Sequence, residues 1–118
     1  MAILVCPRAH VSPLVATRRP ERIVSLLDPG SVFPYSGPAY TDKHLCLSFH
    51  DVQVATSDED TPTLEQVEQL IAFVAAWDRR LPILIHCRAG VGRSTAAAFI
   101  TACVHNPDRR GHPVRAAL

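Results

Sequence analysis

The residues best suited to chemistry are concentrated in one stretch of the chain, which follows an apolar run (Leu81 to Ile85) and leads into an alanine-rich run (Thr95 to Val104). The stretch reads His86-Cys87-Arg88-Ala89-Gly90-Val91-Gly92-Arg93-Ser94-Thr95. Its setting predicts a strand, a glycine-bearing loop and a helix. Backbone N–H groups of such a loop converge at the helix N-terminus, where the helix dipole adds roughly half a positive charge. The stretch therefore predicts a binding site for an anion, of which phosphate is the obvious one.

Cys87 lies at the mouth of this predicted cradle, where N–H groups and the dipole favour the thiolate and should lower the pKa of the thiol. Arg93 follows six residues later, and its planar guanidinium can hold two phosphoryl oxygens at once. Gly90 and Gly92 allow positive φ and leave the loop amides unobstructed. The Ser94 hydroxyl could hydrogen-bond the cysteine sulfur and ease its departure from a phosphocysteine. The nucleophile and the charge of its substrate would thus share one site.

The phosphate-binding residues are predicted to form one continuous run. They are Arg88, Ala89, Gly90, Val91, Gly92 and Arg93.

The pattern His-Cys-x-x-Gly-x-x-Arg-Ser, from His86 to Ser94, resembles the signature loop of the cysteine-dependent protein tyrosine phosphatase superfamily. The compact dual-specificity branch is the closest likeness, and the resemblance extends from about Arg22 to Val104. It implies hydrolysis of phosphate monoesters through a cysteinyl-phosphate. It also implies that His86 supports the cysteine through hydrogen bonds and does not touch substrate.

The resemblance further implies an aspartate that protonates the leaving oxygen and then deprotonates the attacking water. Asp51 is the first candidate, because it lies 36 residues before Cys87 and directly follows a predicted strand. Asp58 and Asp60 are the alternatives, in a polar segment that could fold over the site. No Trp-Pro-Asp triplet is present, which argues against the large tyrosine-specific branch.

The substrate class stays open between phosphoproteins and smaller phosphomonoesters. Arg88 is basic at the second loop position, as in the phosphoinositide-selective relatives that the chain resembles, but Val91 at the fifth position is not. A lipid substrate is therefore only half supported.

Alternating strand and helix patterns predict an α/β fold with a mostly parallel central sheet of about four strands and flanking helices. The predicted strands are Ile3–Cys6, Ile23–Leu27, His44–Phe49 and Ile83–Ile85. A short helix is predicted over Leu14 to Thr17 with Ser12 as its cap, and a longer one with either Thr61 or the Thr63 and Gln66 pair at its start. Such sheets bind ligands at the carboxyl ends of their strands, which is where Cys87 and Asp51 are placed.

Length and composition predict a single domain over residues 1–105 and a polar, disordered tail over residues 106–118. The resemblance implies that this domain is phosphatase-like and abbreviated at its C-terminal end. The net charge of +1 gives no reason to expect a nucleic-acid or anionic-membrane partner. The expected partner is a phosphorylated protein or a small phosphomonoester. Self-association into a homodimer could cover apolar surface that the short C-terminus leaves bare.

The four cysteines show no metal-like or paired spacing, so reduced thiols, no metal and no cofactor are expected. The apolar N-terminal segment is cut short by Pro7 and lacks a basic lead-in, so it is not predicted to be a signal peptide. No apolar run reaches the length of a membrane helix. A cytoplasmic location is therefore expected.

Two other functions compete with a phosphatase. A non-catalytic phosphate-binding module could keep the cradle while losing turnover. A rhodanese-like sulfurtransferase also uses a cysteine in an anion-binding loop, but the Gly90, Gly92 and Ser94 pattern makes it the weaker alternative.

Overall fold

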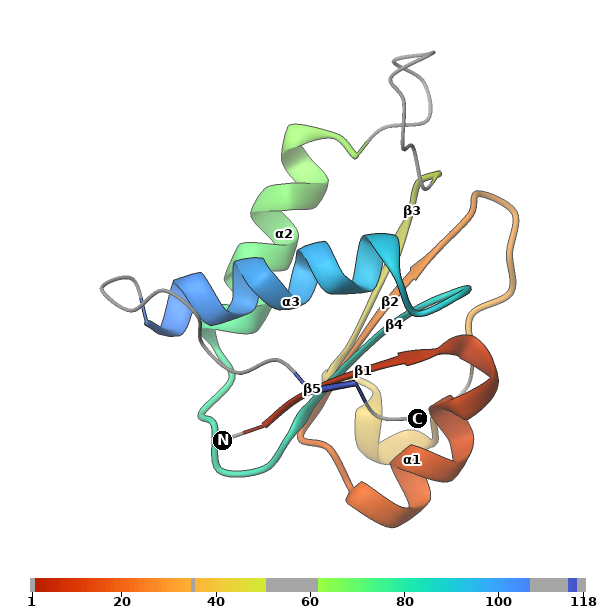
Figure 1. Ribbon diagram of the computed structural model, residues 1–118, viewed down its shortest axis with the longest axis vertical. Helices are drawn as coiled ribbons and strands as arrows, with labels where there is room; N and C mark the ends of the chain where they lie inside the picture. The colour runs from red at the N-terminus through yellow and green to blue at the C-terminus, as the bar shows by residue number, and fades with distance from the viewer. Residues whose placement is uncertain (1, 35, 51–61, 107–114, 117–118) are drawn as a thin grey trace.

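The computed structural model describes residues 2–34, 36–50, 62–106 and 115–116, and they form an α/β structure around one parallel sheet (Figure 1). The strands are β1 (Ile3–Pro7), β2 (Arg22–Leu27), β3 (His44–Ser48), β4 (Ile83–Cys87) and β5 (Arg115–Ala116). The helices are α1 (Val11–Arg18), α2 (Leu64–Ala75) and α3 (Gly92–His105), with 3-10 turns at Arg8–His10 and Pro38–Tyr40. The predicted fold class is confirmed.

The sheet order is β3-β2-β4-β1-β5, and every pairing is parallel. Strand β4 is the central strand, with Cys87 level with Leu26 of β2 and with Pro7 of β1. The carboxyl ends of these three strands therefore meet at one edge, and β3 ends there beside β2. This edge carries the loop between β4 and α3.

Two apolar layers enclose the sheet, because each buried strand sends alternate side chains to opposite faces. Helices α2 and α3 cover one face, over Ile83, Ile85 and Cys87 of β4 (Figure 1). Helix α1 covers the other face, over Leu84. Trp77 anchors the first layer: it is buried, and its ring N–H donates to the Leu81 carbonyl at 2.8 Å.

Helix α2 begins with the capping box that was one of the two predicted alternatives. The Thr63 hydroxyl accepts from the Gln66 amide at 3.1 Å, and the Gln66 side chain accepts from the Thr63 amide at 3.0 Å. Gln66 also donates to the Ser48 carbonyl at 2.9 Å, which ties the start of the helix to the end of β3. The other alternative, Thr61, lies outside the described residues.

Helix α1 differs from its prediction. It begins at Val11, directly after a 3-10 turn, and has no side-chain cap, so the expected cap at Ser12 is wrong. Burial of Val11 against the sheet fixes the earlier start. Pro13 then lies in the first turn, where its missing N–H removes no intrahelical bond.

The two-residue strand β5 pairs with Leu4 and Val5 of β1 and was not among the predicted strands. The division of the chain into residues 1–105 and a tail stays a prediction.

Candidate active site

The loop from Arg88 to Val91 connects the end of β4 to the start of α3 and rests on the end of β1. Gly90 has φ +72°, and a Cβ at that position would lie 2.5 Å from the Pro7 nitrogen and 2.7 Å from the Cys6 carbonyl carbon. Only glycine fits this close approach to another backbone. The Arg8 amide, directly after β1, also donates to the Arg88 carbonyl at 3.3 Å, so the end of β1 and the turn that follows it support the loop.

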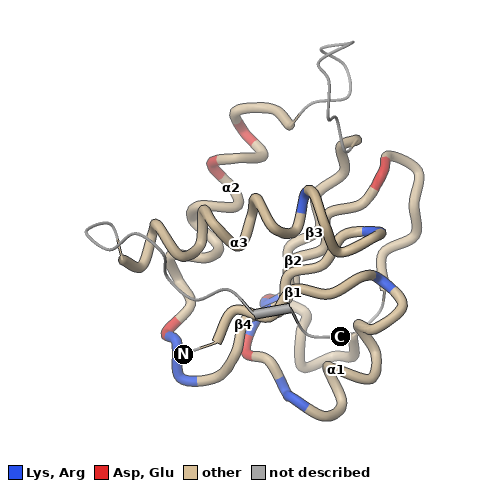
Figure 2. The backbone as a smooth tube through the Cα atoms, in the orientation of Figure 1, with Lys and Arg blue, Asp and Glu red and all other residues tan. Residues whose placement is uncertain are grey.

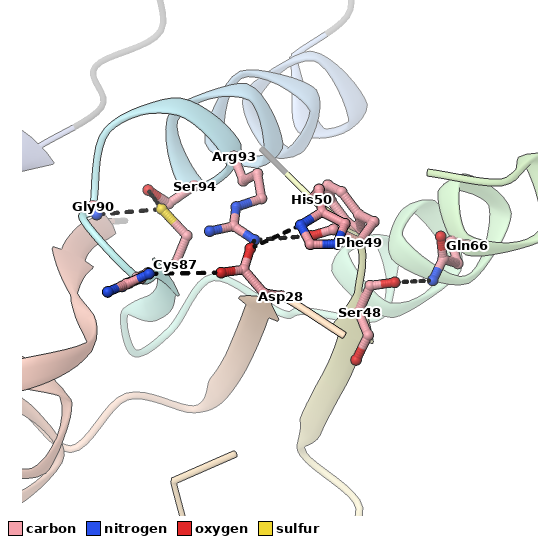
Figure 3. A network of polar contacts seen from close by, with 10 residues as sticks. Asp28, Ser48, Phe49, His50, Gln66, Cys87, Gly90, Arg93 and Ser94 are labelled. Atoms are coloured by element: carbon pink, nitrogen blue, oxygen red, sulfur yellow. Dashed lines mark hydrogen bonds and ion pairs between the residues drawn. The ribbon is translucent and has the colours of Figure 1, made fainter. Parts of the chain in front are cut away.

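The Cys87 sulfur is buried inside this loop and receives hydrogen bonds from it (Figure 3). Ser94 Oγ lies 3.1 Å from Cys87 Sγ, and the Gly90 amide donates to the sulfur at 3.2 Å. Burial acts to raise the pKa of the thiol, but the hydroxyl and amide of Ser94 and the amides of Gly90 and Val91 outweigh it, so the pKa lies below its ordinary value. The predicted stabilisation of the thiolate thus has a geometric basis.

Arg93 reaches from the first turn of α3 toward Asp28 (Figure 3). Its Nη1 donates to Asp28 Oδ1 at 2.8 Å and to the Phe49 carbonyl at 2.8 Å. The side chain is only 6% exposed, yet its Nε has no hydrogen-bond partner among the described residues. A buried guanidinium N–H without an acceptor is costly, and an anion in the cradle would supply one.

Asp28 is a site residue that the sequence analysis missed. It directly follows β2, and its carboxylate lies close to three cationic or titratable groups: Arg93, His50 (3.7 Å) and Arg88 (3.9 Å). Figure 2 shows basic positions at the start of α3 and in the loop before it, and an acidic position in the segment that follows β2. As an ion-paired carboxylate, Asp28 accepts hydrogen bonds and holds Arg93 in place.

The signal that could have found Asp28 is its position in the sheet. Its Asp-Pro-Gly sequence is typical of a turn, which explains the residue without any role in chemistry. The strand-end rule that selected Asp51 applies equally to Asp28, because β2 is the neighbour of β4.

His86 is fully buried next to the cysteine and takes part in a polar contact within the sheet. Its Nε2 lies 2.5 Å from Ser25 Oγ of β2. Burial lowers the pKa of His86 to about 4, an effect partly offset by a backbone interaction with Cys87. The role predicted for this histidine, support of the cysteine through hydrogen bonds, stays a prediction.

The three candidate proton donors, Asp51, Asp58 and Asp60, lie outside the described residues. The segment that carries them starts directly after His50, whose ring lies beside Asp28.

All four cysteines are free thiols. Among the described residues, no three His, Cys, Asp or Glu side chains come together as a metal site would require. Of the helices in the described ranges, none has the length and apolar character needed to cross a bilayer.

The profile of one protein family matches residues 38–105, which is more than half of the chain and includes the whole cysteine loop. The family is described as "Tc-R-P: Polymorphic toxin system, DSP-PTPase phosphatase". The chain belongs to this phosphatase family. Searches of curated proteins and of solved structures found no match.

The match begins after β2, so Asp28 and Ser25 lie outside it although both contact residues within it. Membership of a dual-specificity type phosphatase family agrees with three features of the site: a cysteine with a lowered thiol pKa, backbone amides directed at its sulfur, and a buried arginine whose Nε–H has no acceptor in the part of the chain that the structure describes.

Proposed function

We propose that this protein is a phosphomonoester hydrolase of the protein tyrosine or dual-specificity type that acts through a cysteinyl-phosphate. One observation carries the proposal: a buried sulfur with a lowered thiol pKa lies at the start of the Arg88–Val91 loop, and at its other end lies a buried arginine whose Nε has no acceptor among the described residues. The Cys87 sulfur can act as a nucleophile, and the Arg93 Nε–H can donate a hydrogen bond to a bound anion. The family match agrees with both.

In the proposed first step the Cys87 thiolate attacks phosphorus while Arg93 and the amides from Arg88 to Gly92 bind the phosphoryl oxygens. A sulfur–phosphorus bond forms and the ester phosphorus–oxygen bond breaks. The leaving oxygen takes a proton from a carboxylic acid, for which Asp51 is the candidate, with Asp58 and Asp60 as alternatives.

In the second step water attacks the cysteinyl-phosphate, and the same carboxylate accepts the proton of the water. The sulfur–phosphorus bond breaks, inorganic phosphate leaves, and the sulfur departs as a thiolate. Ser94 lies 3.1 Å from that sulfur and donates to it as its negative charge returns. His86 supports the cysteine from the opposite side of the strand end.

The substrates proposed are phosphotyrosine, phosphoserine or phosphothreonine in proteins, or a small phosphomonoester. The family description connects such domains with polymorphic toxin systems, and we propose that this chain supplies the phosphatase unit of one. A reducing compartment such as the cytoplasm suits an enzyme that depends on a reactive thiolate.

Hydrolysis of an aryl phosphate tests the proposal. Turnover should be abolished in Cys87→Ser and reduced by about a hundredfold or more in Asp51→Asn, since a general acid contributes roughly that much. Trapping the phosphorylated protein by rapid acid quench and locating the phosphate on Cys87 by mass spectrometry would demonstrate the intermediate.

Two results would support the competing functions instead. Binding of vanadate without any turnover would indicate a phosphate-binding module. Conversion of cyanide with thiosulfate, in the absence of phosphatase activity, would indicate a sulfurtransferase. Activity that survives Cys87→Ser would exclude the mechanism.

A further inference from the structure

A second set of polar side chains lies on one face of the sheet, the face opposite to the Cys87 sulfur. Ser25 of β2 is fully buried, and its Oγ lies 2.6 Å from Nε2 of His44 and 2.5 Å from Nε2 of His86. The three residues come from neighbouring strands β3, β2 and β4. They form a relay of hydrogen bonds that crosses half of the sheet and ends next to the nucleophile.

The face on which the relay lies follows from the alternation of side chains along β4. Ile83, Ile85 and Cys87 face α2 and α3, whereas Leu84 belongs to the layer under α1. His86 is two residues after Leu84 and shares its face. The relay therefore lies behind the sulfur and cannot touch a substrate bound in the cradle.

The number of hydrogens that the relay can donate limits how its three side chains can be hydrogen-bonded. Ser25 has one hydroxyl hydrogen, and two ring nitrogens lie within bonding distance of its oxygen. The hydroxyl hydrogen can be donated to only one of the two rings, so at least one histidine must donate its Nε2–H to the Ser25 oxygen. The protonation of each ring at Nε2 therefore depends on that of the other, because both cannot accept from Ser25 at once, and loss of Ser25 would leave both rings without this partner.

The environment of the relay favours neutral rings. Burial lowers the pKa of His44, and burial is also the main reason that the pKa of His86 is about 4, with charge at His44 and Arg8 acting in the same direction. Cys6 of β1 is level with His86 in the sheet, and burial raises the pKa of its thiol to about 11, so it stays a neutral neighbour. The burial that lowers both histidine pKa values thus favours neutral rings, and Ser25 is the hydrogen-bond partner that the two rings share.

We propose that Ser25 and His44 are positioning residues of the active site: they hold the ring of His86 and, through it, the point at which the chain leaves β4 and enters the Cys87 loop. A loop displaced at this point would lengthen the contacts from Ser94 and Gly90 to the sulfur. The inference deepens the proposed function and rests on it for its kinetic consequences, although its structural consequence concerns the thiolate alone.

The test measures the reactivity of the Cys87 thiol as a function of pH, by iodoacetamide alkylation followed by mass spectrometry of the peptide that contains Cys87. Ser25→Ala should move the rise in alkylation to higher pH and lower the rate at pH 6 by about tenfold, which corresponds to one pKa unit. Ser25→Thr keeps the hydroxyl and should stay within about threefold of the wild-type rate.

His44 supplies a second, matched pair of variants at a position that is only half buried. Gln can both donate and accept near the position of Nε2, so His44→Gln should retain the wild-type alkylation curve whichever way the relay is oriented. His44→Leu should shift the curve in the direction of Ser25→Ala. This pair keeps the inference testable if Ser25→Ala does not fold.

The outcomes separate the inference from the proposed function. A wild-type curve with an ordinary thiol pKa would contradict the proposed thiolate mechanism itself. If the wild-type alkylation curve shows a lowered thiol pKa, and neither His44→Leu nor Ser25→Ala shifts that curve, the relay would be overturned while the thiolate mechanism would stand. An equal shift in His44→Leu and His44→Gln would also overturn it, because only bulk and not hydrogen bonding would then matter.

Discussion

Replacement of Ser94 by alanine gives the sharpest prediction for the active site. Ser94 is fully buried, and its hydroxyl lies 3.1 Å from the Cys87 sulfur. Ser94 provides the largest of the interactions that hold the thiol pKa down against the opposing effect of burial. Removing its hydroxyl leaves the burial in place, so the pKa of Cys87 should rise.

The size of the shift follows from the kind of bond that is lost. A hydrogen bond to a charged group contributes about 1.5–3 kcal/mol, and 1.36 kcal/mol corresponds to one pKa unit. Ser94→Ala should therefore raise the pKa of Cys87 by about one to two units. Well below that pKa, the thiolate fraction and the alkylation rate should fall by about ten- to a hundredfold.

The assay is the pH dependence of Cys87 alkylation, combined with stopped-flow hydrolysis of an aryl phosphate. Ser94→Ala should also slow release of the sulfur from the cysteinyl-phosphate, which would appear as a burst of phenolate followed by a slower steady rate. Thr95→Ala is the matched control, since Thr95 is the next residue of α3 and is exposed. A Ser94→Ala curve that coincides with those of the wild type and of Thr95→Ala would refute the role given to this hydroxyl.

Three further predictions concern the support of the loop. Gly90→Ala should lower the free energy of unfolding by at least about 1–3 kcal/mol, the cost of positive φ alone, because its Cβ also meets the Pro7 backbone; urea denaturation that matches the wild type would contradict this fit. Asp28→Asn should raise KM for an aryl phosphate by about tenfold, because Arg93 Nη1 loses a charged acceptor that is partly exposed to solvent; a lower KM would instead show that Asp28 mainly repels substrate. The pKa of His86 is about 4 in the folded protein, below the ordinary 6.5, so the unfolded chain takes up the proton first as the pH falls. The free energy of unfolding should therefore decrease from pH 6.5 toward pH 4, by on the order of 3 kcal/mol. Urea titrations at several pH values should show a weaker pH dependence of this free energy in His86→Gln.

The part of the fold that the sequence predicts best is the part with the strongest local signals. The apolar run before Cys87, the glycines after it and the alanine-rich run beyond them define β4, the loop and α3 without help from the rest of the chain. The Thr63 and Gln66 capping box is equally local, because its two hydrogen bonds join residues three positions apart.

The residues that were missed depend on contacts between distant parts of the chain. Ser25 is one hydroxyl within an apolar strand, and its partner His86 is 61 residues away. Asp28 and Arg93 are 65 residues apart. Strand order decides whether such residues meet, and no local pattern encodes that β2 is the neighbour of β4. The start of α1 was missed for a related reason, since burial against the sheet overrides the local capping preference of Ser12.

The close contact of Gly90 with the end of β1 also affects the order in which parts of the protein fold. Strands β1 and β4 pair from Ile3 with Ile83 to Pro7 with Cys87. The chain between them must therefore be closed into one long loop before Gly90 can contact the end of β1. Contacts of such separation form slowly, whereas the turns of α2 and α3 are local and fast. During refolding, helical signal should therefore return before the sulfur becomes reactive. The cradle would be one of the last features to mature, and a partly folded chain would hold its cysteine as an ordinary thiol.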